Sequence, residues 1–496
     1  MSEKQQIEFK WVCREYLSQQ GLAALRAYGR EVGVGEPTKK SKSVLIDEIV
    51  AILMGEKEPI ARSRRGAPVK DDFVDPKILA QIATLKKEYS INQGNDIYDL
   101  EGRLQATKEN EVVLMVEDPN ATELEKHDIR SIYKGQLVMR ASGQAVILPL
   151  NGKEGAREVL LPANLMNMFD LREGDVLTYH VERRNGFWVA TAILTINECV
   201  TDFFVRGSFD GAEVCYPKEK IRFFNGKGQP TVMEKYLEWF CPVGKGQRGL
   251  ILGAPKSGKS SILFDIARNT QKGNGNPQVL ILLVGQSLEN ISRFKRLVGE
   301  DNLAYTTYEE DADRQVFVAN FILNRAKRLV EAGHDVLLLV DSLHTLANAY
   351  NETEESAGGK MLVGGLESKT LQFIKKFFGT ARNLEQRGSL TMLATLSVET
   401  GNPADDLLKS ELTTLANWEM MLSNELARQR VYPAIDFTNT QGNQLEEFYT
   451  NANEEILRYM RKEFLPKFGS EGMVVALSQC ASMEELEKYM QNQVNK

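Results

Sequence analysis

Residues 249–260 read Gly-Leu-Ile-Leu-Gly-Ala-Pro-Lys-Ser-Gly-Lys-Ser. Their apolar first half is typical of a strand buried on both faces, and residues 261–268 have the apolar spacing of a helix. The loop between them fits the pattern G-x-x-x-x-G-K-[ST] at every fixed position, and that pattern binds phosphate chains. A glycine turn without a ligand is the alternative, and the strand–loop–helix context disfavours it.

This loop predicts a nucleotide site with Mg²⁺. Its glycines let backbone N–H groups face a phosphate chain, and the following helix adds a favourable dipole. We expect Lys259 to neutralise the β- and γ-phosphates and Ser260 to hold the metal. The loop residues expected to contact the nucleotide are Gly253, Lys256, Ser257, Gly258, Lys259, Ser260 and Ser261.

A second buried run, residues 335–342, ends in Asp341-Ser. In P-loop proteins a carboxylate at such a strand end helps to hold Mg²⁺, so Asp341 is the second candidate metal ligand. Further continuous apolar runs at 279–284 and 390–396 alternate with helical stretches. The pattern predicts one α/β domain over residues 236–496, with a parallel sheet covered on both faces.

The preceding segments differ in pattern. Residues 131–200 alternate apolar and polar side chains in five short runs, which predicts a closed barrel of the oligonucleotide-binding (OB) type. Residues 201–235 connect it to the α/β domain. Residues 1–55 carry helical spacing and form a small helical module, whereas residues 56–130 read as a polar linker or insertion. Its basic tract is interpreted as a solvated tether rather than a phosphate contact.

Composition excludes several classes of protein. A chain of 496 residues with a net charge of −7 has globular composition and is long enough for several domains. Five scattered cysteines form no metal-binding or disulfide pattern. No apolar run reaches the ~18 residues of a membrane helix, and the first residues lack a secretory signal. We therefore expect a cytoplasmic protein without a membrane partner.

Several motifs resemble the bacterial transcription termination factor Rho family. They are residues 242–260, Asp341-Ser-Leu-His-Thr-Leu-Ala-Asn-Ala-Tyr-Asn, residues 377–385 and Arg430-Val-Tyr-Pro-Ala-Ile-Asp. The order of helical module, OB barrel and RecA-type motor is also similar. The resemblance spans almost the whole chain apart from residues 56–130.

The resemblance implies a ring of six subunits that binds ATP and Mg²⁺ between subunits and draws single-stranded RNA through its centre. Carried over to this sequence, Arg430 lies near the nucleotide and Tyr432 packs on the adenine. Lys360 lies on a loop that touches RNA in the pore.

The catalytic positions depart from that family. Gln286 stands where the family has its glutamate base, and an amide cannot take a proton from the attacking water. Glu289 is a weak substitute three residues later, since a displacement of ~1 Å can cost ~100-fold in rate. Asn443 stands where the arginine finger is expected, and its loss removes ~10³–10⁵ in turnover.

The RNA side departs too. The family stacks bases on aromatic residues of the barrel, at positions where this chain has Val146 and Leu160. Tyr179 and Trp188 remain as candidate RNA contacts, together with Phe187, and core packing is an equally weighted alternative for them. The family's second pore lysine aligns with Thr413 or Thr414.

Three hypotheses follow. The first is a Rho-like hexameric factor that binds ATP, acts on RNA or RNA polymerase in transcription termination, and hydrolyses ATP slowly or not at all. The second is an active RNA-dependent ATPase and translocase that uses Glu289 with an arginine from elsewhere, such as Arg428, Arg458 or Arg461. The third is a non-catalytic paralogue that joins and regulates a ring of an authentic Rho. A rotary-type ATPase fits the P-loop but not the OB barrel.

Overall fold

The computed structural model describes scattered positions between 14 and 34, residues 40–54, residue 57, and residues 132–495 with short gaps at 154–157, 185, 202–203, 205, 225–227, 271–274, 386, 443–447 and 450. Two compact units divide the chain, residues 1–127 and 128–496, and each is considered by itself. The predicted linker at 56–130 lies outside the described residues, except for Lys57.

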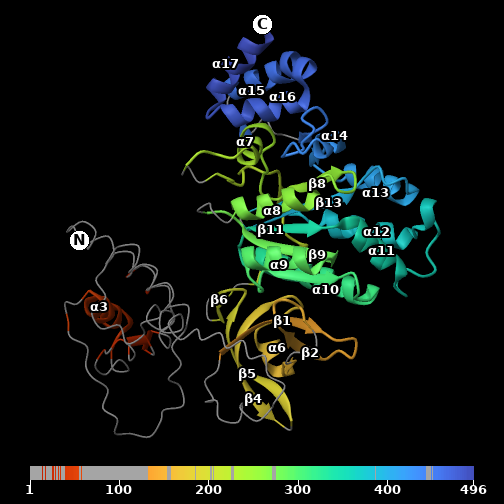
Figure 1. Ribbon diagram of the computed structural model, residues 1–496. Helices are drawn as coiled ribbons and strands as arrows, with labels where there is room; N and C mark the ends of the chain where they lie inside the picture. Colours follow the sequence, from red (N-terminus) through yellow and green to blue (C-terminus); the bar gives the residue numbers. More distant parts are fainter. Residues whose placement is uncertain are drawn as a thin grey trace. The chain divides into compact units, whose positions relative to one another are not determined.

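The first unit contains helix α3, Lys42–Leu53 (Figure 1). Leu45 and Ile49 are on its buried side and belong to one small apolar cluster with Leu17 and Leu25, two described helical positions earlier in the chain. The remaining residues of the two other predicted helices lie mostly outside the described part. The described positions agree with a helical module.

The OB barrel is confirmed as a six-stranded sheet in the order β3-β2-β1-β4-β5-β6. A parallel pairing of β3 with β5 closes it. Its elements are β1 Ile132–Met139, β2 Ala145–Leu148, β3 Val159–Leu160, α6 Ala163–Met168, β4 Val176–Arg184, β5 Phe187–Ile196 and β6 Cys199–Val200. Inward-facing side chains such as Leu137, Ile147 and Leu177 fill its interior, as the period-two pattern predicts.

The α/β domain is also confirmed. Its main sheet runs β10-β9-β11-β13-β8-β14-β15, and the five central pairings are parallel. The strands are β7 Val214–Cys215, β8 Arg248–Gly253, β9 Gln278–Gln286, β10 Leu303–Thr307, β11 Val336–Asp341, β12 Arg382–Leu384, β13 Ser389–Ser397, β14 Trp418–Met421 and β15 Gln441–Gly442. All four apolar runs of the sequence became central strands.

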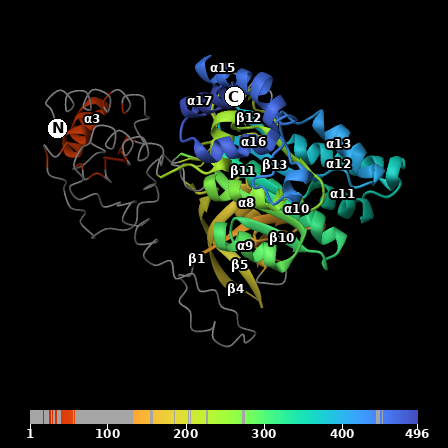
Figure 2. The same cartoon turned by 45° about the horizontal axis from the view of Figure 1, so that its top comes forward.

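Helices cover both faces of this sheet (Figures 1 and 2). One face is packed by α8 Lys259–Thr270 and α9 Leu288–Val298, and α7 Val232–Lys235 and η4 Tyr236–Phe240 belong to the same apolar core. The C-terminal elements α15 Asn451–Tyr459, η7 Met460–Phe464, α16 Leu465–Gln479 and α17 Met483–Val494 extend this core by packing on α7 and on one another. The other face is packed by α10 Ala312–Glu331, α11 Leu343–Glu352, α12 Ser368–Gly379 and α13 Pro403–Thr413. The short elements η5 Val363–Gly365 and α14 Asn424–Arg428 lie in connections. Along β11, Leu337 and Leu339 enter the first core, and Leu338 enters the second.

The barrel packs against α10 within the second unit. On its outer face, Val138, Val146 and Leu148 form a buried cluster with Phe321 of α10. The Gln136 side chain donates from Nε2 to the Phe321 carbonyl at 2.7 Å. We call this contact the barrel–α10 interface.

A buried charge cluster strengthens that interface. Arg206, in the connection after the barrel, donates to both carboxylate oxygens of Asp175 at 2.9 and 2.7 Å. Its guanidinium also lies 3.8 Å from Glu331 of α10, which accepts from Arg328 at 2.5 Å. Because Asp175 and Glu331 are buried, both need these partners.

Among the described residues, no helix is long and apolar enough to cross a membrane.

Candidate nucleotide-binding site

The loop after β8 has the backbone that the sequence predicts for a phosphate cradle. Lys256 and Gly258 adopt positive φ values of 66° and 99°. A side chain on Gly253 would meet the Ser257 hydroxyl at 2.4 Å, so this close approach requires glycine. Helix α8 begins at Lys259, so the backbone N–H groups of its first turn and the positive end of its dipole face the loop. The geometry can therefore hold an anion.

Lys259 is the cation of this cradle. Its ammonium donates to the carbonyls of Gly253 and Ala254 at 2.8 and 2.9 Å. Burial lowers the pKa of Lys259, and the nearby Asp341 carboxylate opposes that shift. A partly desolvated ammonium held by two neutral carbonyls favours the approach of a phosphate oxygen.

The two predicted metal ligands are brought together. Ser260 Oγ donates to Asp341 Oδ2 at 2.6 Å, and Thr395 Oγ1 donates to Asp341 Oδ1, also at 2.6 Å. Asp341 is only 3% exposed. A hydroxyl and a carboxylate are oxygen ligands of the kind that Mg²⁺ prefers, so Ser260 and Asp341 fit this metal. Sequence reasoning missed Thr395, whose partnership with Asp341 depends on the neighbouring strands β11 and β13.

Gln286 lies at the end of β9, next to the metal-binding strand. Its Nε2 donates to the Asp341 carbonyl at 3.4 Å, and its Oε1 accepts from Asn290 Nδ2 at 2.9 Å. The amide therefore has a donor and an acceptor partner on neighbouring elements. Asn290, one turn into α9, is a second residue that sequence reasoning missed.

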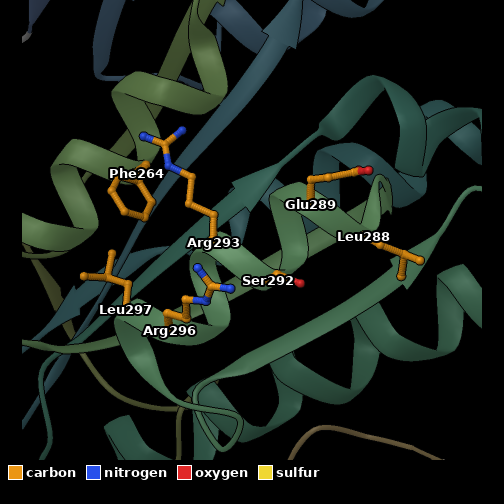
Figure 3. A pocket seen from close by; sticks show the side chains of 7 residues that line it. All are labelled: Phe264, Leu288, Glu289, Ser292, Arg293, Arg296 and Leu297. Carbon is orange, nitrogen blue, oxygen red and sulfur yellow. The ribbon is translucent and has the colours of Figure 1, made fainter.

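Glu289 has different surroundings. It is exposed in the first turn of α9 and lines a pocket of about 660 Å³ with Phe264, Arg293 and Arg296. Figure 3 shows its carboxylate pointing away from Arg293. The backbone N–H of Glu289 itself and then the Ser287 hydroxyl lower its pKa. A more acidic carboxyl is a weaker general base.

His344 also borders the metal residues. Its Nδ1 is 2.9 Å from Ser342 Oγ, directly after Asp341. Burial lowers its pKa, and Asp405 opposes that shift. The imidazole is therefore kept neutral beside Lys259, which also disfavours its charged form.

Tyr432 lies beside the helix that follows the phosphate loop. Its hydroxyl donates to Asp265 Oδ2 of α8 at 2.7 Å, while 49% of the residue stays exposed. Burial and then the Asp265 carboxylate raise the pKa of Tyr432, so the phenol remains protonated. Arg430 is exposed two residues earlier, with a φ of 61°. Tyr432 is thus held against α8, the helix that follows the phosphate loop, and its contact with the adenine stays a prediction.

The predicted pore residue Lys360 is exposed in the loop between α11 and α12. The loop backbone is held by Glu367 Oε2, which accepts from the Gly359 N–H at 2.8 Å, and by Ser368 Oγ, which accepts from the Lys360 N–H at 3.0 Å. Thr414 ends α13, and its hydroxyl donates to the Glu411 carbonyl at 2.7 Å.

The barrel aromatics divide between core and surface. Tyr179 is 4% exposed and lies in the barrel core, 6.3 Å from the Tyr133 ring, so the structure supports the core interpretation and not base stacking. Trp188 is half-buried against the same core. Phe187 at the tip of β5 is 63% exposed.

The positions of the missing stacking aromatics are covered. Val146 and Leu160 belong to the barrel–α10 interface, where Phe317 and Phe321 lie against them. Val146 is therefore closed to a base, with 1% of the residue exposed, whereas Leu160 is half-buried at the edge of the same cluster.

The arginines proposed for catalysis lie on three different elements near the C-terminal end. Asn443 lies outside the described residues. Arg428 is exposed on α14, and Arg458 forms an ion pair with Glu454 on α15 at 3.3 Å. Arg461 follows on η7.

Comparisons with known proteins find one family model and several similar chains. Residues 234–441 match the model of the ATP synthase alpha/beta family, nucleotide-binding domain. Two solved structures, a type III secretion ATPase and the ATP synthase subunit NeqB of Nanoarchaeum equitans, share 20% and 16% identity over 52% and 58% of this chain and 83% and 79% of theirs, with TM-scores of 0.43 and 0.47.

Curated relatives are much more similar in sequence. Transcription termination factor Rho of Karelsulcia muelleri is 35% identical over 304 residues, which are 60% of this chain and 79% of the relative. The Rho proteins of Salmonella typhimurium and Buchnera aphidicola are each 33% identical, over 64% and 66% of this chain and 76% and 79% of theirs. Because this chain is 33–35% identical to these relatives over 76–79% of their length, it belongs to the transcription termination factor Rho family.

Proposed function

We propose that this chain is a ring-forming, cytoplasmic transcription termination factor that binds ATP and Mg²⁺ but turns ATP over slowly or not at all. The ring, in this proposal, is a hexamer that acts on RNA or on RNA polymerase. The observation that carries the proposal is the pair formed by an intact phosphate cradle and a glutamine beside it.

Binding is supported by the position of Lys259 against the loop carbonyl of Gly253 and by the hydrogen bond between the adjacent Ser260 and Asp341. Lys259 would neutralise the phosphates, and the other two would hold Mg²⁺. The metal would supply charge neutralisation at the β- and γ-phosphates. Tyr432 would carry the adenine, with Arg430 near the nucleotide.

Weak hydrolysis is supported by the surroundings of Gln286. The amide is held between the Asp341 carbonyl and Asn290, and it cannot accept the proton that hydrolysis releases. Glu289 is exposed on the pocket side of α9 with a lowered pKa, which makes it a poor replacement. Loss of a general base removes ~10²–10⁴ in rate.

The RNA contact is proposed to lie in the α/β domain, at Lys360, rather than on the barrel. The barrel–α10 interface covers the positions of the missing aromatics, and Tyr179 is in the core. Trp188 and the exposed Phe187 at one end of the barrel are the remaining stacking candidates there. The proposed division of the chain is a helical module at 1–55, a polar linker at 56–130, a barrel at 131–200, a connector at 201–235 and a motor at 236–496.

The decisive experiment measures ATP binding and ATP hydrolysis side by side, with and without pyrimidine-rich RNA. Micromolar or tighter ATP binding with turnover at least 100-fold below that of the Salmonella relative, assayed in parallel, is the expected result. RNA-stimulated turnover of several ATP per second would contradict the proposal and favour the active translocase. Absence of ATP binding by the wild-type protein would refute the proposed nucleotide site itself.

The same Gln286 observation also suits a non-catalytic subunit in a mixed ring. Nucleotide held between subunits stabilises assembly without being cleaved. Affinity capture of the tagged chain from its own cells should then recover a second Rho-type chain. Recovery of the tagged chain and its untagged copies alone would support the homo-hexamer.

A further inference from the structure

We infer that Asp265 is a positioning residue that fixes the ring of Tyr432 as a platform for the base of the bound nucleotide. The inference rests on the proposed nucleotide binding and assigns a role to a residue of α8 outside the P-loop motif. It is carried by an unusual combination, a half-exposed tyrosine ring whose hydroxyl is anchored in a nearly buried carboxylate.

The anchor is well defined. Asp265 is 9% exposed, and its Oδ2 accepts from the Tyr432 hydroxyl at 2.7 Å. Its Oδ1 lies 2.9 Å from the Arg268 guanidinium on the same helix. Both carboxylate oxygens are therefore occupied by this chain. Asp265 is placed to hold a side chain and not to contact a ligand itself.

The ring remains available in spite of this anchor. The bond engages only the phenolic oxygen at the ring edge, and half of the Tyr432 surface stays open. Fixing the ring in advance removes the entropy that a free side chain loses when a base stacks on it. A planar aromatic face held in this way is suited to a purine.

The anchor also connects the base side to the phosphate side. Asp265 and Lys259 are six positions apart on α8, so the helix separates them by a rise of about 9 Å. A nucleotide has its base and its triphosphate at opposite ends of the ribose. One rigid helix therefore sets the distance between the ring that takes the base and the ammonium that takes the phosphates.

The neighbouring contact holds α8 in place. Phe264 directly precedes Asp265 on α8. The Arg293 guanidinium of α9 lies 3.8 Å from the centroid of the Phe264 ring. Figure 3 shows the two side chains together at one end of the pocket. Phe264 also packs edge-on against Phe294 of α9 at 5.3 Å. This support lets Asp265 act as a fixed point.

The test compares ATP with inorganic tripolyphosphate, which has the phosphates but no base. Asp265→Ala and Tyr432→Phe should each weaken ATP binding by about fivefold to tenfold, the effect of losing one ordinary hydrogen bond. Tripolyphosphate affinity should stay within twofold of wild type. Asp265→Asn retains an acceptor and should recover most of the ATP affinity.

A double variant separates positioning from general damage. If Asp265 acts through the Tyr432 hydroxyl, Asp265→Ala with Tyr432→Phe should bind ATP no more weakly than either single variant. Additive losses, or equal losses for ATP and tripolyphosphate, would overturn the inference. Unchanged ATP affinity in Tyr432→Phe would overturn it as well, even if Asp265→Ala fails to fold.

Two controls complete the design. Asp313→Asn, an exposed carboxylate in the first turn of α10, should change neither affinity. Lys259→Ala should lose both ligands. A wild-type protein that binds neither ligand would refute the proposed nucleotide site, whereas wild-type binding with unaltered variants would refute only the role of Asp265.

Discussion

Ser260 Oγ donates to Asp341 Oδ2 at 2.6 Å, although the two residues are 81 positions apart in the chain. The bond joins the first turn of α8 to the end of β11, two elements that meet at the carboxyl edge of the parallel sheet. Ligands of open α/β sheets bind at this edge. The bond therefore marks the place where the phosphate cradle and the metal ligands become one site.

Thr395 is expected to raise the affinity of the site for Mg²⁺ by holding Asp341 in place. Replacing Thr395 by Val keeps the shape but removes the hydroxyl that holds Asp341 Oδ1. Mg²⁺ affinity of the nucleotide complex should fall about tenfold, the lower range for loss of an outer-shell partner. Titrating Mg²⁺ into the protein–ATP mixture by calorimetry measures this. Thr191→Val in the barrel is the matched control, and equal affinities in the two variants would contradict the prediction.

Gln286 is expected to limit hydrolysis. Gln286→Glu supplies a carboxylate beside the Asp341 carbonyl, and Asn443→Arg supplies the missing guanidinium. The double variant should raise ATP turnover by at least ~100-fold, since a base alone contributes ~10²–10⁴. Phosphate release with and without RNA is the measurement.

The companion variant Glu289→Gln should leave the wild-type turnover as it is, because that side chain is exposed and is held by Ser287 and its own backbone. A turnover that drops with Glu289→Gln would favour the active translocase instead.

Restoring aromatics to the barrel should not restore RNA binding. Val146→Phe with Leu160→Tyr places larger side chains against Phe321 in the barrel–α10 interface. Overpacking of this kind costs about 1–3 kcal/mol, so the melting temperature should fall while affinity for oligocytidine stays unchanged. Fluorescence anisotropy measures the affinity for oligocytidine, and thermal unfolding measures the melting temperature. A gain in RNA affinity of tenfold or more would show that this face opens.

The buried charge cluster should be essential for stability. Asp175→Asn removes the charge that Arg206 contacts through two hydrogen bonds and leaves that guanidinium poorly compensated. Breaking a buried pair in this way costs about 3–5 kcal/mol in the free energy of unfolding. Glu182→Gln breaks the exposed pair with Arg184 and should cost at most about 1 kcal/mol. Urea denaturation of both variants distinguishes them, and similar midpoints would be the contrary result.

Lys360 should contribute one phosphate contact. Lys360→Ala is expected to weaken RNA binding uniformly across sequences and to reduce the salt dependence of binding by about one unit of slope. Lys153→Ala, on the barrel side near Tyr305, is the comparison variant. An unchanged slope for Lys360→Ala would exclude a phosphate contact at this loop.

Local sequence determined the phosphate site. The site at residues 253–260 can be predicted from consecutive residues, because the backbone bend, the helix start and the cation all lie within eight positions. The buried runs predicted the parallel sheet for a similar reason, since a strand covered on both faces must be apolar throughout. Period-two patterning predicted the barrel in the same way.

Other features depend on pairings between distant segments, which no local pattern encodes. Thr395 reaches Asp341 only because β13 lies beside β11, and Asp265 meets Tyr432 across 167 positions. Tyr179 could not be assigned from its strand, because alternation fixes which residues share a face but not which face is inside. The tertiary structure alone decided that Val146 and Leu160 face α10, since the partner that covers an apolar surface is chosen by packing between elements and not by the strand that carries it.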